Sequence, residues 1–308
     1  MSASRVVSLA EAVAGVPDGA NMTFGGFAAY FTPLAFVREM IRQGKRDIEM
    51  TSVAECWVAD YLAGAGALKR ARFSNFMFEG LGRCHNFSRG VERGDILVED
   101  YSHFAITSRL VAAGLGVPFL PIKPMAGTDL MAKQGFEAEK GRPFACPFTG
   151  ESVLLVPAVR PDVAVIHASR ADREGNTQLF GYTSVVDEQA RAAKRVIVTV
   201  EEIVDDPVVR EQPELTILPG FLVDAVVEVP FGAHPTGMYR YYDQDFAFLS
   251  DYYTASRHEE AFGRHLDEYV FGVPDHWAYL RKLGIRRLMD LRADPGLGLA
   301  RKHARTLQ

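Results

Sequence analysis

Carboxylate residues stand directly after several apolar segments of the 308-residue chain, where they could act on a substrate. They are Glu55, Glu79, Glu99 with Asp100, and Glu201 with Glu202. If the apolar segments are parallel strands, these side chains meet at the carboxyl edge of one sheet, where a carboxylate can serve as nucleophile or general base. The alternative for each is a charge at a helix N-terminus, stabilised by the helix dipole. For any single carboxylate this alternative is favoured.

A glycine pair follows the first apolar segment and offers chemistry through backbone amides. Residues 22–24 read as strand, Gly25 and Gly26 follow, and a helix is expected from about Pro33 to Gly44. Glycines at such a junction let backbone N–H groups approach a ligand without an intervening Cβ. Ligands of open α/β sheets bind at that edge. A tight connection that needs positive φ is an equally open interpretation, since the pattern matches no nucleotide-binding fingerprint.

Other residue types that commonly do chemistry form no recognisable site. His167 and His234 are more readily explained as structural hydrogen-bonding residues than as bases. Cys56, Cys84 and Cys146 lie far apart without a C-x-x-C pair, so neither a disulfide framework nor a zinc ribbon is indicated. Neither the H-E-x-x-H nor the G-x-S-x-G motif occurs. We therefore expect no metal site.

The charge balance limits the classes of partner. The net charge is −5, and no cluster of Lys and Arg forms a basic patch, which argues against a nucleic-acid or anionic-membrane surface. No run approaches the roughly 18 apolar residues of a membrane span, and the N-terminal residues do not resemble a signal peptide. The expectation is a cytoplasmic protein that binds neither nucleic acid nor membrane.

Strand-like and helix-like segments alternate through the first 235 residues. Strands are expected at 48–54, 72–78, 95–99, 119–122, 153–156, 163–167, 196–200 and 225–229, helices at 9–16, 57–62 and 101–115, and a long loop at 124–150. This alternation predicts a largely parallel sheet, and the continuous apolar run at 163–166 suits a strand covered on both faces. The predicted fold is an α/β domain of three α/β/α layers.

Residues 236–308 differ from the preceding residues in composition and are expected to form a helical, aromatic-rich extension of the α/β domain of residues 1–235. Aromatic residues crowd positions 238–253, and helical segments are expected at 259–271, 274–283 and 286–292. Such aromatic clusters are more typical of a core or a subunit interface than of a ligand cage. The extension is therefore expected to pack on the domain or on a partner subunit, with the basic end, 299–308, frayed.

The order of several segments resembles that of a known enzyme family. The segments are Gly25-Gly26-Phe27 with Pro33, Glu99-Asp100-Tyr101-Ser102, 116–121, Gly127-Thr128-Asp129, 146–150, 165–168, 172–176, 193–203 and 232–235. Over about residues 7–298 the chain resembles the A (α) subunit of family I coenzyme A-transferases, of the glutaconate and 3-oxoadipate type. The late segments 275–284 and 295–298 favour the glutaconate type.

The resemblance implies a heteromeric enzyme whose catalytic glutamate is carried by a homologous B (β) subunit, often in an α2β2 assembly. It implies ping-pong transfer of CoA from an acyl-CoA donor to a carboxylate acceptor, expected to be a dicarboxylate, through a glutamyl-CoA thioester on the B subunit. The CoA thioester is then a substrate, no cofactor is bound, and this chain alone is inactive.

The resemblance also suggests roles for residues of this chain. Gly25, Gly26 and Phe27 are the candidates for an oxyanion-stabilising loop or the adjoining wall of the acyl pocket. The other acyl-pocket candidates are Ser74, Asn75, Gly127, Thr128 and Asp129. Glu55 lies roughly where the B subunit carries its nucleophile, and it is interpreted as a pseudo-symmetric counterpart rather than as a second active site.

Two other functions stay open. One branch of the same family hydrolyses a ring-opened CoA thioester in steroid degradation and uses a glutamate of the A chain near the position of Glu99, which makes Glu99 the fallback catalytic residue. The second is a ligand-sensing module built on the same sheet. The chain has no helix-turn-helix pattern and no basic face, which disfavours a sensor of the gene-regulating kind.

Overall fold

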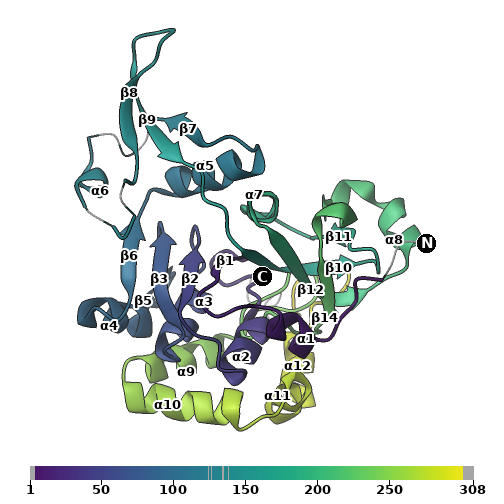
Figure 1. The fold of residues 1–308 in the computed structure, drawn as a ribbon. Coiled ribbons are helices and arrows are strands. Elements are labelled where there is room, and N and C mark those ends of the chain that lie inside the picture. The colour runs from purple at the N-terminus through teal and green to yellow at the C-terminus, as the bar shows by residue number, and fades with distance from the viewer. Residues whose placement is uncertain (1–3, 124, 126, 134, 138, 301–308) are drawn as a thin grey trace.

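The main sheet is built mostly from parallel strands that follow one another across its width (Figure 1). A computed structural model describes residues 4–300 except 124, 126, 134 and 138. The parallel strands lie in the order β14 (Ala225–Glu228), β12 (Arg195–Ile203), β10 (Val163–Ala171), β1 (Asn21–Phe24), β2 (Ile48–Thr51), β3 (Leu68–Phe73) and β6 (Leu97–Asp100). The short strands β11 (Thr177–Gln178) and β13 (Thr216–Leu218) extend β10 antiparallel.

Both faces of this sheet are covered, as the apolar run in β10 predicts. Val163 and Val165 pack into one core with helices α1 (Leu9–Ala14), α2 (Leu34–Arg42) and α3 (Cys56–Gly64). Ala164 and Ile166 face the other way and pack against α7 (Val186–Ala192), which lies beside α5 (His103–Gly114). Side chains alternate between the faces of a strand, so a run of apolar residues fills two cores at once. The three-layer prediction is confirmed.

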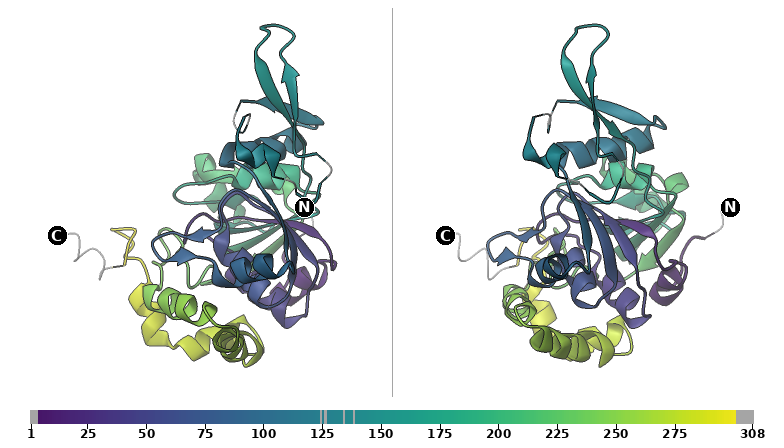
Figure 2. Two further views of the ribbon diagram at one scale, coloured as in Figure 1. Left: turned by 90° about the vertical axis from the view of Figure 1, so that its left-hand side faces the viewer. Right: turned by 60° about the vertical axis from the view of Figure 1, so that its left-hand side comes forward.

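A second, smaller sheet projects from the main body (Figures 1 and 2). It contains β7 (Phe119–Ile122), β9 (Ser152–Pro157) and β8 (Arg142–Ala145), all antiparallel, and it packs on α5. The strands at 119–122 and 153–156 are therefore confirmed, but they do not belong to the parallel sheet. Pro121 and the partial exposure of β7 suit an edge position outside a buried parallel sheet.

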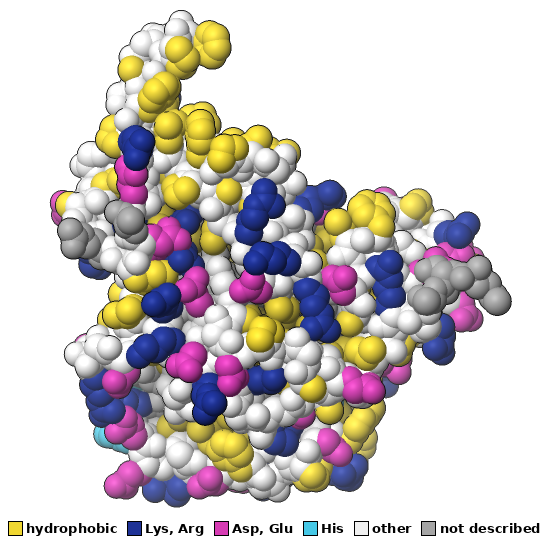
Figure 3. Space-filling model, in the orientation of Figure 1, with side chains coloured by type: hydrophobic (Ala, Val, Ile, Leu, Met, Phe, Trp, Pro, Cys, Tyr) yellow, Lys and Arg dark blue, Asp and Glu magenta, His cyan; other side chains and the backbone are white. Residues whose placement is uncertain are grey.

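The small sheet carries exposed apolar side chains on the arm formed by β8 and β9. Hydrophobic atoms gather over this projecting part in Figure 3. Phe144 in β8 and Phe148 in the turn after it are both exposed, Phe148 almost completely. A concentration of exposed aromatic side chains on a protruding hairpin marks a surface suited to contact with another molecule.

Several predicted boundaries were wrong. The strand expected at 72–78 runs instead over Leu68–Phe73, because its charged residues Arg70 and Arg72 are paired with Glu49 of the neighbouring strand and so are tolerated inside the sheet. The expected loop at 124–150 contains α6 (Asp129–Ala132) and β8, although residues 124, 126, 134 and 138 lie outside the described part. Additional short elements are α4 (His85–Arg93), β4 (Met77–Phe78), β5 (Gly82–Arg83), α8 (Asp206–Glu211), Pro213–Leu215 and Gly220–Leu222.

The C-terminal segment is helical, as predicted, and it packs on the α2–α3 side of the main sheet. Its helices are α9 (Phe246–Ser256), α10 (Glu259–Leu266), a π-helical turn (Asp267–Phe271), α11 (His276–Leu283) and α12 (Ile285–Leu291). Tyr252 donates to Asp60 at 2.9 Å, and Tyr61 lies 2.8 Å from His265, so both aromatic residues join the extension to α3. The end of the expected frayed tail, 301–308, lies outside the described residues.

Candidate active-site edge

The end of β1 and the start of α3 meet at a single close contact. Gly26 has φ +134°, a conformation that favours glycine, and an added Cβ would stand 1.7 Å from Oε2 of Glu55. Glu55 is the residue before α3 and is almost completely buried. Both of its carboxyl oxygens lie 3.3 Å from the hydroxyl of Thr32, at the entrance to α2. The glycine is therefore required for this approach, as well as for the turn.

Burial raises the pKa of the Glu55 carboxyl well above its ordinary value, and this outweighs the hydrogen bonds from Thr32 and from the amides of Val58 and Trp57. Burial therefore favours the protonated form of the enclosed Glu55 carboxyl. Glu55 stands at the N-cap position of α3. A carboxyl that is sealed from solvent, and whose protonated form is favoured by burial, is a poor nucleophile for a thioester.

The three residues of the predicted oxyanion loop differ in what their amides do. The Gly25 N–H donates to the Val165 carbonyl at 2.8 Å, and the Phe27 N–H donates to the Tyr30 carbonyl at 3.3 Å. The Gly26 N–H has no hydrogen-bond partner in the part of the chain that the structure describes, although Gly26 is buried. Buried backbone donors are rarely left unpaired, so the Gly26 amide differs from the amides of Gly25 and Phe27.

Tyr182 completes this part of the edge and was missed by the sequence reasoning. Its hydroxyl donates to the Phe27 carbonyl at 3.1 Å, and its ring makes edge contacts with Phe27, Tyr30 and Phe31. Burial raises the pKa of Tyr182, with the nearby Tyr30 and Glu55 adding to the effect. It lies in the irregular segment between β11 and α7, where no periodicity signals a contact with residues far away in the sequence.

The two other predicted loops attach to neighbouring points on one buried cluster. The amides of Ser74 and Asn75 donate to the Val53 carbonyl at 3.3 and 3.2 Å. The amide and hydroxyl of Thr128 donate to the Met125 carbonyl at 3.1 and 2.8 Å. Val53 and Met125 pack in the same cluster. Gly127, Thr128 and Asp129 themselves are exposed. The structure thus anchors both loops at the same cluster, beyond the ends of β2 and β6.

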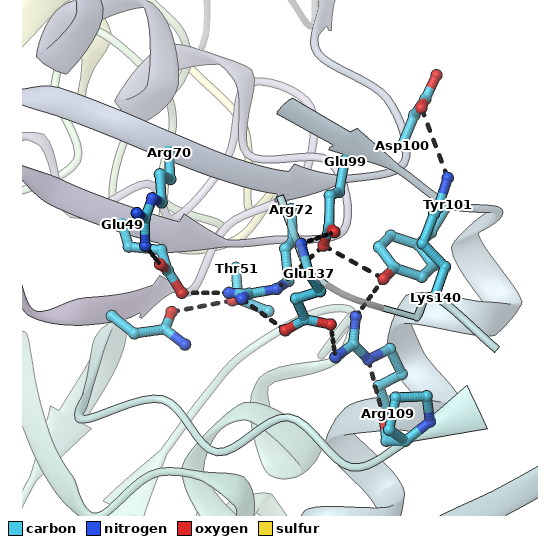
Figure 4. Close-up of polar contacts among 12 residues, drawn as sticks. Glu49, Thr51, Arg70, Arg72, Glu99, Asp100, Tyr101, Arg109, Glu137 and Lys140 are labelled. Carbon is cyan, nitrogen blue, oxygen red and sulfur yellow. Dashed lines mark hydrogen bonds and ion pairs between the residues drawn. The ribbon is translucent and has the colours of Figure 1, made fainter. Parts of the chain in front are cut away.

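Glu99, the fallback catalytic residue, is enclosed by charged and polar partners (Figure 4). It is fully buried, lies 3.3 Å from Nε of Arg72, and accepts from the Tyr101 hydroxyl at 3.3 Å and the Glu137 amide at 2.6 Å. A Cβ added to Gly135 would stand 2.0 Å from its side chain. The chain's own segment 135–137 therefore covers Glu99.

Glu201 and Glu202 are hydrogen-bonded to other side chains, and Glu79 does not lie at the edge of the parallel sheet. Glu201 accepts from His167 and Tyr242, each at 2.7 Å, and Glu202 accepts from Tyr241 at 2.6 Å. Glu79 follows the hairpin strand β4, so the expectation that it ends a strand of the parallel sheet was wrong.

The two histidines are buried and hydrogen-bonded. His167 lies between Glu201 and Thr199, and His234 lies 2.7 Å from the Tyr279 hydroxyl and 3.1 Å from Asp245. Within the described ranges no group of three or more His, Cys, Asp or Glu residues is placed to hold a metal ion. In the same ranges, every helix is too short or too polar to cross a lipid bilayer.

Comparisons with known proteins cover nearly the whole chain. The chain is 38% identical to the A subunit of the 3-oxoadipate CoA-transferase of Pseudomonas knackmussii over 91% of its length and 98% of that protein. It is 37% identical to the A subunit of the glutaconate CoA-transferase of Acidaminococcus fermentans over 96% and 97% of the two chains. The crystal structure of the glutaconate coenzyme A-transferase from that organism superimposes with a TM-score of 0.93, at 36% identity, over 98% of this chain and all of that chain.

The hydrolase alternative has weaker support. A cholesterol ring-cleaving hydrolase subunit of Rhodococcus jostii is 26% identical over 88% of this chain and 93% of that protein. The transferase subunits match more of the chain at clearly higher identity, so the transferase interpretation is favoured. The model of the coenzyme A transferase family matches residues 6–229. Taken with the sheet edge described above, these matches establish that the chain belongs to the coenzyme A transferase family.

Proposed function

We propose that this chain is the A subunit of a heteromeric CoA-transferase and that a homologous B subunit supplies the catalytic glutamate. The observation that carries the proposal is the enclosure of Glu55: the acid at the expected edge of this chain is buried against Gly26 and Thr32. Glu99 is covered as well. The enclosure of both carboxyls supports a reactive acid that is supplied by the partner subunit. The similarity to proteins named as A subunits, over almost their full length, also supports a catalytic glutamate on a separate B subunit.

In the proposed reaction, the partner's glutamate attacks the donor acyl-CoA, forming an acyl-glutamyl anhydride and releasing the CoA thiolate. The thiolate attacks the glutamyl carbonyl, which frees the donor carboxylate and leaves a glutamyl-CoA thioester. The acceptor carboxylate then repeats the two steps in reverse order and leaves as its CoA thioester. Each step passes through a tetrahedral oxyanion. The unpartnered amide of Gly26 is suited to stabilise such an oxyanion because it is held rigidly and away from bulk water.

The acyl pocket is proposed to lie beside Gly26, between the loops that carry Ser74 with Asn75 and Gly127 with Thr128 and Asp129. Both loops are fixed near the cluster of Val53 and Met125 beyond the strand ends. The donor and acceptor are proposed to be an acyl-CoA and a dicarboxylate, in keeping with the relatives that share this length and identity. No bound cofactor is required by this chemistry.

The partner contact is proposed to involve the arm formed by β8 and β9. Phe144 and Phe148 expose aromatic surface there, which a subunit interface would cover. We propose an α2β2 assembly, with residues 1–235 as the CoA-transferase domain and 236–308 as an extension packed on it. A cytoplasmic location fits the free thiols of Cys56, Cys84 and Cys146 and the use of a CoA thioester.

Activity of the purified chain with and without its partner tests the proposal. The chain and a homologous B chain are produced separately and together, and exchange of CoA between an acyl-CoA and glutarate is followed by chromatography. We expect the complex to exceed either chain by at least about 100-fold, since the attacking group and the oxyanion donor sit on different chains. Equal activity of the isolated chain would refute the proposed division.

A further inference from the structure

Two arginines from different elements hold one carboxylate between them (Figure 4). Glu137 contacts Arg72 of β3 through Oε1 and lies 2.8 Å from Nη2 of Arg109 of α5 through Oε2. The side chains of Arg72 and Arg109 are only 8% and 2% exposed, whereas that of Glu137 is 26% exposed. A carboxylate reachable from solvent thus neutralises two guanidinium groups that are not.

The two arginines depend on Glu137 to different degrees. Arg72 also contacts Glu49 and Glu99. Arg109 donates to the Pro157 carbonyl at 2.9 Å and to the Tyr101 hydroxyl, and among the described residues Glu137 is its one acidic partner. A buried guanidinium left without a counter-ion is strongly unfavourable. The position of the Glu137 carboxylate therefore has to hold an anion, but nothing requires that the anion be part of the chain.

Glu137 also borders two hollows. A cavity of about 590 Å³ is lined in part by Arg109, Arg142, Phe119, Leu155 and Pro157. A second cavity, of about 380 Å³, is lined in part by Met131, Lys133 and Lys140. Glu137 lines both cavities. The larger one is lined by apolar side chains together with the guanidinium group of Arg109, a combination that suits a short carbon chain ending in a carboxylate.

We propose that Arg72 and Arg109 form a binding site for the carboxylate of a small organic acid, and that Glu137 occupies this site when the acid is absent. The ligand exchanges one carboxylate for another, so the two arginines stay neutralised throughout. Rotation of the Glu137 side chain toward solvent is sufficient for the exchange. The planar carboxylate of the ligand then accepts from both guanidinium groups, as Glu137 does.

The site could serve the second carboxylate of a dicarboxylate substrate or a separate acid that only binds. The first assignment depends on the proposed function, whereas the binding site itself does not. A dicarboxylate substrate and a separate acid would both present a carboxylate to Arg109. The KM measurements described below distinguish the two.

Calorimetric titration of the full-length chain, alone and in complex with its B subunit, tests the site. The probes are glutarate and valerate, and the variants are Glu137→Gln, Glu137→Gln with Arg109→Met, and Glu139→Gln. Glu139 is the matched control, because it lies in the same segment and lines both cavities but pairs with Arg142. Circular dichroism and thermal unfolding establish that each variant is folded. The double variant keeps the charge balanced, since it removes one acid and one base together.

We expect Glu137→Gln to bind glutarate about 10-fold more tightly than the unaltered chain, because the internal competitor has lost its charge. Glu139→Gln should bind as the unaltered chain does, and the double variant should not bind. Absence of glutarate and valerate binding in folded Glu137→Gln, or binding that survives Arg109→Met, would overturn the proposal.

In the complex, a lower KM of Glu137→Gln for glutarate with an unchanged KM for valerate would identify the ligand as the substrate's second carboxylate. Binding with both KM values unchanged would identify a separate acid. Both results support the site. Loss of transferase activity in every form, with binding retained, would reject the proposed function and leave the site intact.

Discussion

Gly26 and Glu55 are in contact at the carboxyl edge of the sheet, with no room for even a methyl group between them. The distance from an added Cβ of Gly26 to Oε2 of Glu55 is 1.7 Å, well below any real contact. The same glycine carries the unpartnered buried amide. The Glu55 side chain therefore packs directly against the peptide of Gly26 and restricts its position. A change to the Glu55 side chain is expected to affect the Gly26 amide as well.

Gly26→Ala should destabilise the chain and reduce turnover. The added methyl overlaps Glu55, and alanine is strained at φ +134°, so we expect a loss of about 3 kcal/mol of unfolding free energy and a fall in kcat of the complex. Gly44→Ala is the control: its φ is +70° and nothing lies within 4 Å of the added Cβ, so strain alone should cost about 1 kcal/mol. Equal losses in both variants, measured by urea unfolding, would argue against the contact with Glu55.

Glu55→Gln should leave CoA transfer nearly unchanged. Burial raises the pKa of the Glu55 carboxyl well above its ordinary value, which favours the protonated side chain, and an amide of the same shape replaces it with little change in packing. We expect kcat of the complex to stay within about 3-fold of the native value. Glu55→Ala should lower kcat more than it changes KM, since it removes the wall behind Gly26. Abolition of activity by Glu55→Gln would mean that the carboxylate itself takes part in the chemistry.

Glu99→Gln separates the transferase from the hydrolase interpretation. Glu99 partly neutralises buried Arg72, so its amide variant should lose about 3 kcal/mol of stability. Glu49→Gln, which removes another carboxylate from the same arginine, is the matched control. If the chain is a transferase subunit, both variants lose stability, and both retain kcat once folded with the B subunit. Selective loss of thioester turnover in Glu99→Gln would favour the hydrolase.

Stability should decrease as the pH falls below about 6.5. Burial lowers the pKa of His234 and of His265 to about 4, and that of His276 to about 3. An unfolded histidine titrates near pH 6.5, so between these values the unfolded chain binds more protons than the folded one. Each histidine then contributes up to about 1.4 kcal/mol of lost stability per pH unit.

Asp60 and Glu55 oppose this trend in part, because burial raises the pKa of Asp60 to about 6 and that of Glu55 well above its ordinary value, so the folded chain holds both protons more readily than the unfolded one. Three histidines outweigh two carboxyl groups, so the unfolding free energy should still fall between pH 7 and pH 5. His265→Phe, which removes one titrating ring, should show a shallower slope. A stability that is constant or rises over this range would contradict the burial of these histidines.

The alternation of apolar segments was sufficient to predict the parallel sheet, because β10 is apolar at successive positions and both of its faces are covered. The same reasoning placed β3 wrongly. Its charged residues Arg70 and Arg72 gave no apolar signal, and their acidic partner Glu49 lies on another strand. The assignment of β7 and β9 to the small sheet depends on antiparallel contacts that local sequence does not encode.

The site was partly predictable for a similar reason. The glycine pair signals close approach of a backbone, and Gly26 indeed approaches another group closely. The group that Gly26 approaches is Glu55, 29 positions away in the sequence. The hydrogen bond between Tyr182 and Phe27 joins residues that are still further apart, so local sequence could not predict either contact. Glu137 gave no signal because its partners, Arg72 and Arg109, come from an edge-region strand and a helix that only the fold brings together.

The division of the active site between two chains is tested most directly by locating the covalent intermediate. The complex is incubated with acyl-CoA, reduced with borohydride to convert the glutamyl thioester to an alcohol, and digested for peptide mass mapping. We predict inactivation with the reduced glutamate on the B chain alone and every carboxylate of this chain, Glu55 and Glu99 included, unaltered. A reduced glutamate in this chain would contradict the account.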